Sequence, residues 1–135
     1  MKKLIIFALA ATMAIAMSAQ SNQVSITVTT SWHNVYAWMW ECPKQYNERF
    51  IPLKQVNDST WTLILDMDET AYKKAGILFV DVDSWNGDLQ KTNDIHLSSG
   101  CYIIPKTQEK GQLVQRPNGL VCKELIFKCN KEDCI

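Results

Sequence analysis

The sequence predicts an all-β sandwich built mainly of antiparallel strands. Apolar and polar side chains alternate with a period of two in several segments, and turn-forming residues separate these segments at short intervals. Only residues 69–76 (ETAYKKAG) suggest a helix, of about two turns, closed by Gly76. About seven or eight short strands of this kind are typical of an immunoglobulin-like antiparallel β-sandwich.

The first four strands follow from their residue patterns. Residues 24–30 (VSITVTT) alternate and are rich in β-branched side chains, and residues 35–40 (VYAWMW) alternate aliphatic with aromatic side chains. Pro52 confines residues 50–56 (FIPLKQV) to a sheet edge or a bulge. Every second side chain of residues 60–67 (TWTLILDM) is apolar, which indicates one buried face. Further strands are expected at residues 76–82, in two short pieces within 95–105, and at 120–129.

The first 19 residues have the features of a bacterial secretory signal peptide. Two lysines precede an apolar stretch at residues 4–17, and a small-x-small ending precedes Gln20. A membrane anchor is the alternative, but the run is short for a membrane span and no basic or polar stop-transfer flank follows it. A lipoprotein anchor is not supported, because the cleavage junction has no cysteine. We therefore predict a secreted or periplasmic protein without a membrane span.

The rest of the chain is predicted to form one domain. Residues 20–105 are expected to form the β-sandwich module, and residues 106–135 a cysteine-containing C-terminal extension packed on the same domain. The full chain has 14 basic and 14 acidic residues; removing Lys2 and Lys3 leaves 14 − 2 = 12 basic residues and a formal charge of −2. The absence of a Lys/Arg run argues against nucleic acid as a partner.

All five cysteines follow the signal peptide, at Cys42, Cys101, Cys122, Cys129 and Cys134. Export permits disulfides, but an odd count leaves at least one thiol unpaired or bonded to another chain. A zinc site in the tail is the alternative, yet the chain has no C-x-x-C pair and both histidines are distant in sequence. We favour disulfides, whose pairing the sequence leaves open.

Residues 34–40 (NVYAWMW) raise the question of which strand face belongs to the core. Period two sends the aliphatic side chains to one face and the aromatic side chains to the other. The aliphatic set is Val35, Ala37 and Met39, and the aromatic set is Tyr36, Trp38 and Trp40. Rings that point inward would pack in the core, as most large aromatic side chains do. If the aliphatic set points inward instead, the rings form part of an exposed platform.

Trp85 favours the platform. It lies in a long polar segment, residues 83–94 (DSWNGDLQKTND), and loops on a rigid β-scaffold often carry binding residues. The same segment offers amides and carboxylates. Flat rings beside such groups suit a sugar, because the electropositive C–H face of a pyranose lies against an aromatic π-face. The sugar hydroxyls then form hydrogen bonds with amides and carboxylates.

Three segments, in this order, resemble the starch-binding carbohydrate-binding modules of family 26 and the related family 25. They are NVYAWMW, FIPLKQV and ILFVDVDSWNGDLQKTNDIHLSSGCY. Those modules share an aromatic-x-aromatic-x-aromatic strand, a Trp-Pro-Gly-type turn, and an apolar strand that ends in a loop with Trp or Gln-Thr-x-Asp. The resemblance covers roughly residues 24–104, and QKTND is similar to the Gln-Thr-Gly-Asp pattern with one residue inserted.

The resemblance implies roles for individual residues. Its stacking rings and hydrogen-bonding partners fall on Tyr36, Trp38, Trp85, Gln90 and Asp94. Trp40 matches a family aromatic whose place, in the core or in the site, stays open. The Trp-Pro-Gly ring is missing here or is replaced by Phe50 or Tyr46, and the tail after residue 105 has no counterpart. We expect the strand-held Trp38 to contribute more binding energy than Trp85 in its glycine-containing loop.

The implied function is non-catalytic binding of α-glucans such as starch and maltooligosaccharides, beside a separate amylase or glycan-uptake system. No catalytic residue, metal ligand or cofactor is predicted. A glycosidase needs two carboxyl groups facing each other across a cleft, for which this chain has little room. Residues 81–88 fail the EF-hand pattern because Trp85 stands where an oxygen ligand is needed, which leaves only an irregular calcium site as an alternative. The alternative function is a secreted β-sandwich interaction or structural domain without sugar binding.

Overall fold

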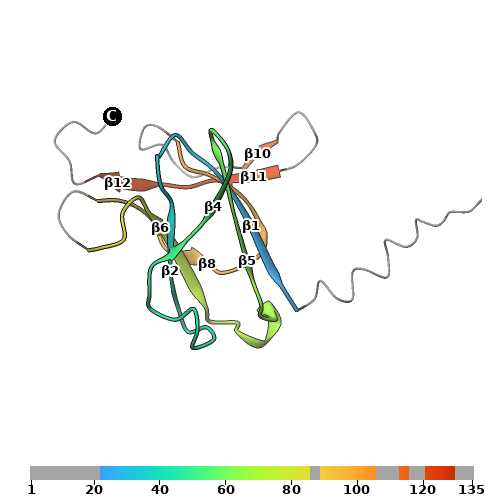
Figure 1. The fold of residues 1–135 in the computed structure, drawn as a ribbon. Coiled ribbons are helices and arrows are strands. Elements are labelled where there is room, and N and C mark those ends of the chain that lie inside the picture. The colour runs from blue at the N-terminus through green and yellow to red at the C-terminus, as the bar shows by residue number, and fades with distance from the viewer. Residues whose placement is uncertain (1–21, 86–88, 106–112, 116–120, 130–135) are drawn as a thin grey trace, which may run out of the picture.

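The protein folds into two β-sheets that pack face to face, which confirms the predicted all-β sandwich (Figure 1). The computed structural model describes residues 22–85, 89–105, 113–115 and 121–129. The expected signal peptide lies outside these residues. Within them, no helix is long and apolar enough to cross a membrane. The immunoglobulin-like arrangement of the strands stays a prediction.

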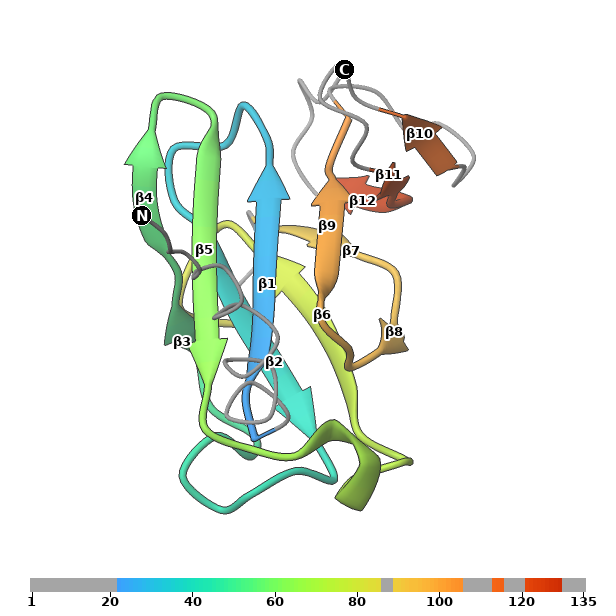
Figure 2. The same cartoon turned by 90° about the vertical axis from the view of Figure 1, so that its right-hand side faces the viewer.

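The first sheet has the strand order β10-β11-β9-β1-β5-β4. Its strands are β1 (Val24–Thr29), β4 (Lys54–Asn57), β5 (Thr60–Leu65), β9 (Gly100–Ile103), β10 (Leu113–Gln115) and β11 (Val121–Glu124). β1 pairs antiparallel with β5 but parallel with β9, and β9 also pairs parallel with β11, so this sheet is mixed. In Figure 2, β4, β5, β1 and β9 lie side by side in front of β2 and β6.

The second sheet has the strand order β12-β7-β6-β2-β3, and β8 also pairs with β6. Its strands are β2 (Tyr36–Trp40), β3 (Ile51–Pro52), β6 (Gly76–Val80), β7 (Gln90–Thr92), β8 (Ile95–His96) and β12 (Phe127–Cys129). β2 pairs antiparallel with β6 over five residues, from Tyr36 opposite Val80 to Trp40 opposite Gly76. The edge position predicted for Pro52 is confirmed, because β3 forms the edge of the sheet, where a missing N–H breaks no ladder. The single strand expected at residues 50–56 is divided, however, because β4 belongs to the first sheet.

The main core lies between the inner faces of the two sheets. β1 and β5 contribute alternate apolar side chains, as their period of two predicts, while Thr27, Thr62 and Ile64 face away from the core. From the second sheet come Ile77 and Phe79 of β6 and the alternate residues of β2. The largest fully buried side chains are Phe79, Ile26, Met39, Leu65, Ile77, Leu97 and Leu125.

The predicted two-turn helix at residues 69–76 is wrong. Only a single 3-10 turn, η1 (Glu69–Ala71), forms there. Asp68 caps it by accepting a hydrogen bond from the Thr70 N–H at 3.0 Å. The segment has too few apolar residues to bury a helical face, and a helix this short is unstable without such burial. Gly76 begins β6 instead of ending a helix.

The single strand expected at residues 120–129 is also wrong, because the chain changes sheets within it. β11 belongs to the first sheet and β12 to the second. Between them, the Leu125 N–H donates to the Ile103 carbonyl at 2.7 Å, and the Asn93 N–H donates to the Ile126 carbonyl at 2.7 Å. Leu125 is fully buried in the main core. The segment after residue 105 therefore supplies strands to both sheets.

A disulfide joins β9 to β11 on the outer face of the first sheet. Cys101 and Cys122 stand directly opposite each other with a Cα–Cα distance of 4.5 Å. Both are buried, so the bond is shielded from solvent. Cys42 is a half-buried free thiol. Cys134 and the side chain of Cys129 lie outside the described part of the chain.

Candidate functional site

The aliphatic side chains of β2 face the main core and its aromatic side chains face outward, as expected for an exposed platform of rings. Val35, just before the strand, and Ala37 and Met39 are buried in the main core. Tyr36, Trp38 and Trp40 are half-buried on the opposite, outward face of the second sheet. The three rings therefore do not enter the main core.

A second hydrophobic cluster covers this outward face, and we call it the outer cluster. Its buried members are Leu78, Val80 and Leu89. Five half-buried residues pack around them: Tyr36, Trp38, Trp40, Phe50 and Val82. Leu89 directly precedes β7 and, two residues before Lys91, lies on the same outward face of the sheet. The connection between β6 and β7 also carries Trp85.

Three rings of this region contact one another, and we call them the ring cluster. The ring centroids of Trp38 and Phe50 are 4.8 Å apart, those of Trp38 and Trp85 4.9 Å, and those of Phe50 and Trp85 5.1 Å. The ring planes meet at 56°, 75° and 51°, respectively. Trp85 is 45% exposed, the most exposed of these rings. The ring cluster thus forms a tilted surface with the Trp85 indole at its outermost position.

Phe50, and not Tyr46, completes the ring cluster. Phe50 comes just before the edge strand β3, which lies beside β2. The Tyr46 hydroxyl instead accepts a hydrogen bond from the Asp66 N–H at 2.8 Å, and its ring packs against the main core. Of the two residues considered for the third ring, only Phe50 lies against Trp38 and Trp85.

Trp40 has a packing function in the outer cluster. Its indole lies over Gly76, its partner across β2 and β6, and a Cβ atom at residue 76 would overlap the ring. The glycine therefore leaves the space that the indole fills. This close approach explains why Gly76 stands at the start of a buried strand.

Gln90 is bound to Asp81 in the structure. The Gln90 N–H donates to Asp81 Oδ1 at 2.7 Å, and Gln90 Nε2 donates to Asp81 Oδ2 at 3.1 Å. The Asp81 N–H donates in turn to the Gln90 carbonyl at 3.3 Å. Asp81 directly follows β6 and Gln90 begins β7, so these bonds tie together the two ends of the connection that carries Trp85. No pattern in the sequence indicated this function of Asp81.

Tyr36 lies on the same outward face as Trp38, whereas Asp94 lies in a connection after β7. Tyr36 stands opposite Val80, and Val80 stands opposite Lys91 on its other side, so the three lie in one row across the sheet. Lys91 is half-buried and was not among the expected site residues. Asp94 is exposed in the connection between β7 and β8, which runs along β6.

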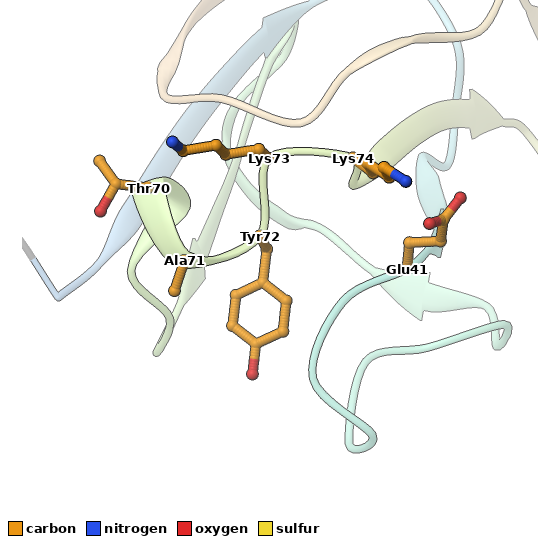
Figure 3. A pocket seen from close by; sticks show the side chains of 6 residues that line it. All are labelled: Glu41, Thr70, Ala71, Tyr72, Lys73 and Lys74. Atoms are coloured by element: carbon orange, nitrogen blue, oxygen red, sulfur yellow. The ribbon is translucent and has the colours of Figure 1, made fainter.

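A hollow that does not involve the rings lies at the end of the sandwich near η1 (Figure 3). This open pocket of about 360 Å³ is lined by Glu41, Thr70, Ala71, Tyr72, Lys73 and Lys74. Figure 3 shows Lys74 pointing toward Glu41, while Lys73 points away. A neighbouring hollow of about 470 Å³ includes Cys42, whose thiol pKa is raised by burial and by the nearby Glu48. Neither hollow contains a residue of the ring cluster.

Among the residues that the structure describes, no group of three or more His, Cys, Asp or Glu side chains could hold a metal ion. No protein-family model, no curated protein and no solved structure matches this chain. Among the described residues, the ring cluster is the feature that points to a specific function.

Proposed function

We propose that the protein is a secreted, non-catalytic carbohydrate-binding protein that recognises α-glucans by aromatic stacking. The observation that carries this proposal is the ring cluster, in which Trp85 is held against Trp38 and Phe50 with 45% of its surface exposed. An indole offers the largest flat apolar face among the side chains, and a pyranose ring can cover it.

The tilt of the rings favours a curved glycan. Ring planes that meet at 51° to 75° cannot support one flat, extended chain on coplanar faces. A chain that turns from one sugar to the next can place one unit on Trp85 and the next beside Trp38 or Tyr36. α-Linked glucans curve in this way, which agrees with the resemblance to the starch-binding modules.

Polar groups around the rings supply hydrogen bonds to the sugar hydroxyls. Tyr36 and Lys91 lie in one row across the sheet and can offer a hydroxyl and an ammonium, and the exposed Asp94 in the connection after β7 can offer a carboxylate. The Gln90 Nε2 atom already donates to Asp81, so the side-chain carbonyl oxygen is the group that Gln90 can offer to a sugar. A separate amylase or uptake system would use the bound glucan.

Isothermal titration with maltoheptaose tests the proposal. A site of two or three rings should give a dissociation constant of about 10 µM to 1 mM, or about −7 to −4 kcal/mol. The protein should also be retarded in gels that contain amylopectin. Cellohexaose, which is β-linked and extended, serves as the control ligand and should bind more weakly. Absence of both heat and retardation would exclude α-glucan binding.

The same surface also fits a protein partner, because tryptophans with exposed edges are frequent centres of protein interfaces. The test separates the two functions. If the wild-type protein binds none of maltoheptaose, amylopectin and cellohexaose, a protein-interaction function becomes the better proposal. Heat that disappears in the Trp85→Ala variant would instead support the sugar.

A further inference from the structure

We propose that Asp81 and Gln90 are positioning residues that hold Trp85 in its binding orientation, an inference that rests on the carbohydrate-binding function proposed above. Three hydrogen bonds join Asp81 to Gln90, and two of them end on the Asp81 carboxylate. Neither residue needs to touch the sugar for this function. They act through the ring that lies between them in the chain.

The Asp81 carboxylate is well suited to close the connection between β6 and β7. One carboxylate oxygen accepts the backbone N–H of Gln90, and the other accepts its side-chain amide, so a single residue is held at two points. Hydrogen bonds to an ionised carboxylate are stronger than those between neutral groups. The resulting clamp fixes where the chain leaves β6 and where it enters β7.

Two further contacts complete the support of Trp85. Leu89, next to Gln90, is only 5% exposed and packs with Leu78 and Val80 in the outer cluster. Trp85 itself contacts the rings of Trp38 and Phe50. The indole of Trp85 thus packs against two rings. The buried Leu89 anchors one end of the connection that carries it, and the clamp sets the distance between the two ends of that connection.

The clamp should increase affinity by reducing the conformational freedom that is lost on binding. A ring that samples its binding orientation only part of the time binds more weakly in proportion to that fraction. If the unclamped connection holds Trp85 correctly about one tenth of the time, affinity falls about tenfold. The resemblance assigned Gln90 a direct contact with the sugar, whereas the structure shows its Nε2 donating to Asp81.

Three variants of the full mature protein test the clamp. Asp81→Ala removes both acceptors and should weaken maltoheptaose binding about tenfold. Asp81→Asn should restore most of the affinity, because its oxygen can accept the Gln90 N–H while its NH₂ donates to the Gln90 side-chain carbonyl. Asp83→Ala is the matched control: Asp83 is exposed and forms no hydrogen bond with a described residue, so affinity should be unchanged.

Iodide quenching of tryptophan fluorescence gives a readout that needs no sugar. Repeating each variant with Trp85→Phe identifies the Trp85 share of the signal, since Trp32 and Trp61 are buried. Asp81→Ala should increase the quenching of Trp85, whereas Asp81→Asn and Asp83→Ala should leave it unchanged. If Asp81→Ala folds poorly, Gln90→Leu replaces it and keeps the backbone bonds. Because the Gln90 side-chain carbonyl can also contact a sugar, the quenching of Trp85 without sugar, and not the affinity, tests the clamp in this variant, and unchanged quenching would refute it.

The two readouts separate the failure of the clamp from the failure of the function. If wild-type protein does not bind maltoheptaose, the proposed function fails, and quenching alone judges the clamp. If wild type binds, and Asp81→Ala binds equally well with unchanged quenching, positioning by Asp81 is refuted. An Asp81→Ala variant with a lower melting temperature but full affinity would refute it as well, because Asp81 would then only stabilise the fold.

Discussion

Replacing Trp85 with alanine should remove most of the glucan affinity and leave the protein folded. Trp85 is the outermost ring of the ring cluster, and 45% of its surface is free for a ligand. Truncating a central aromatic anchor usually weakens binding by about 2 kcal/mol or more, which corresponds to roughly 30-fold. Binding already in the range of 0.1 mM would then become too weak for titration.

The stability cost of this change follows from the burial of the ring. A tryptophan can bury about 150–250 Å² of surface, of which somewhat more than half, roughly 100 Å², is covered here. At about 25 cal/mol per Å² this area corresponds to about 2.5 kcal/mol. Residual burial in the unfolded chain lowers the estimate to about 1.5–2.5 kcal/mol. Domains of this size are typically stable by about 5–15 kcal/mol, so the variant should remain folded.

Trp38→Ala should affect stability more than Trp85→Ala. Trp38 lies between Phe50 and Trp85 and belongs to the half-buried shell around Leu78. Its loss removes two ring contacts and opens the outer cluster, which should lower the free energy of unfolding by about 2–4 kcal/mol. The sequence favoured Trp38 as the stronger binding residue, because a strand fixes its ring. The structure gives Trp85 both the larger free surface and a clamped connection, so we expect the opposite order for binding.

Urea unfolding and titration with maltoheptaose, measured on the same preparations, separate the two effects. Phe50→Leu is a useful control, since it keeps apolar volume below Trp85 but removes a ring. The argument fails if Trp85→Ala keeps wild-type affinity, or if it unfolds at a lower urea concentration than Trp38→Ala. The first result would place the binding surface elsewhere, and the second would mean that Trp85 supports the fold more than Trp38 does.

Three further predictions concern the scaffold. The Cys101→Ala/Cys122→Ala double variant opens a loop with a sequence separation of 21 and should lose about 3 kcal/mol in urea unfolding; a loss below about 1 kcal/mol would contradict this. Gly76→Ala should cost about 1–3 kcal/mol because the new Cβ overlaps the Trp40 ring, and an unchanged melting temperature would place that ring elsewhere. Burial raises the pKa of the Cys42 thiol, so at pH 8 iodoacetamide, followed by peptide mass spectrometry, should modify it more slowly than a cysteine in a short peptide.

The period of two predicted the parts of the fold in which one strand face is buried. It identified the inner faces of β1 and β5, because their outward residues are polar or exposed. It could not decide the orientation of β2, since both of its faces are apolar. The deciding facts are the missing Cβ at Gly76 beneath the Trp40 ring and the packing of the β2 rings against the cluster that contains Leu89. Both are contacts between segments that lie far apart in sequence.

The sequence failed where pairing partners, and not the local pattern, determine the structure. Residues 90–92 are polar and resembled a loop, yet they form β7 because β6 and β12 lie on either side. The change of sheet near Leu125 is equally invisible in a segment that contains no turn-forming residue between β11 and β12. In the candidate site, too, local patterns could be read from the sequence and contacts between segments could not. The rings at Trp38 and Trp85 could be proposed from the sequence, whereas the bond between Asp81 and Gln90 could not.

The position of Trp85 is the feature that stability alone does not explain. The sandwich closes its main core with the inner residues of β2, and the outer cluster already buries Leu78, Val80 and Leu89. An isolated exposed apolar residue would need no explanation. Trp85, however, continues directly into the half-buried rings of Trp38 and Phe50, and hydrogen bonds fix both ends of its connection. An indole that packs on two rings with almost half of its surface in water leaves an apolar face for a ligand to cover, and we propose the flat apolar face of a sugar as that ligand.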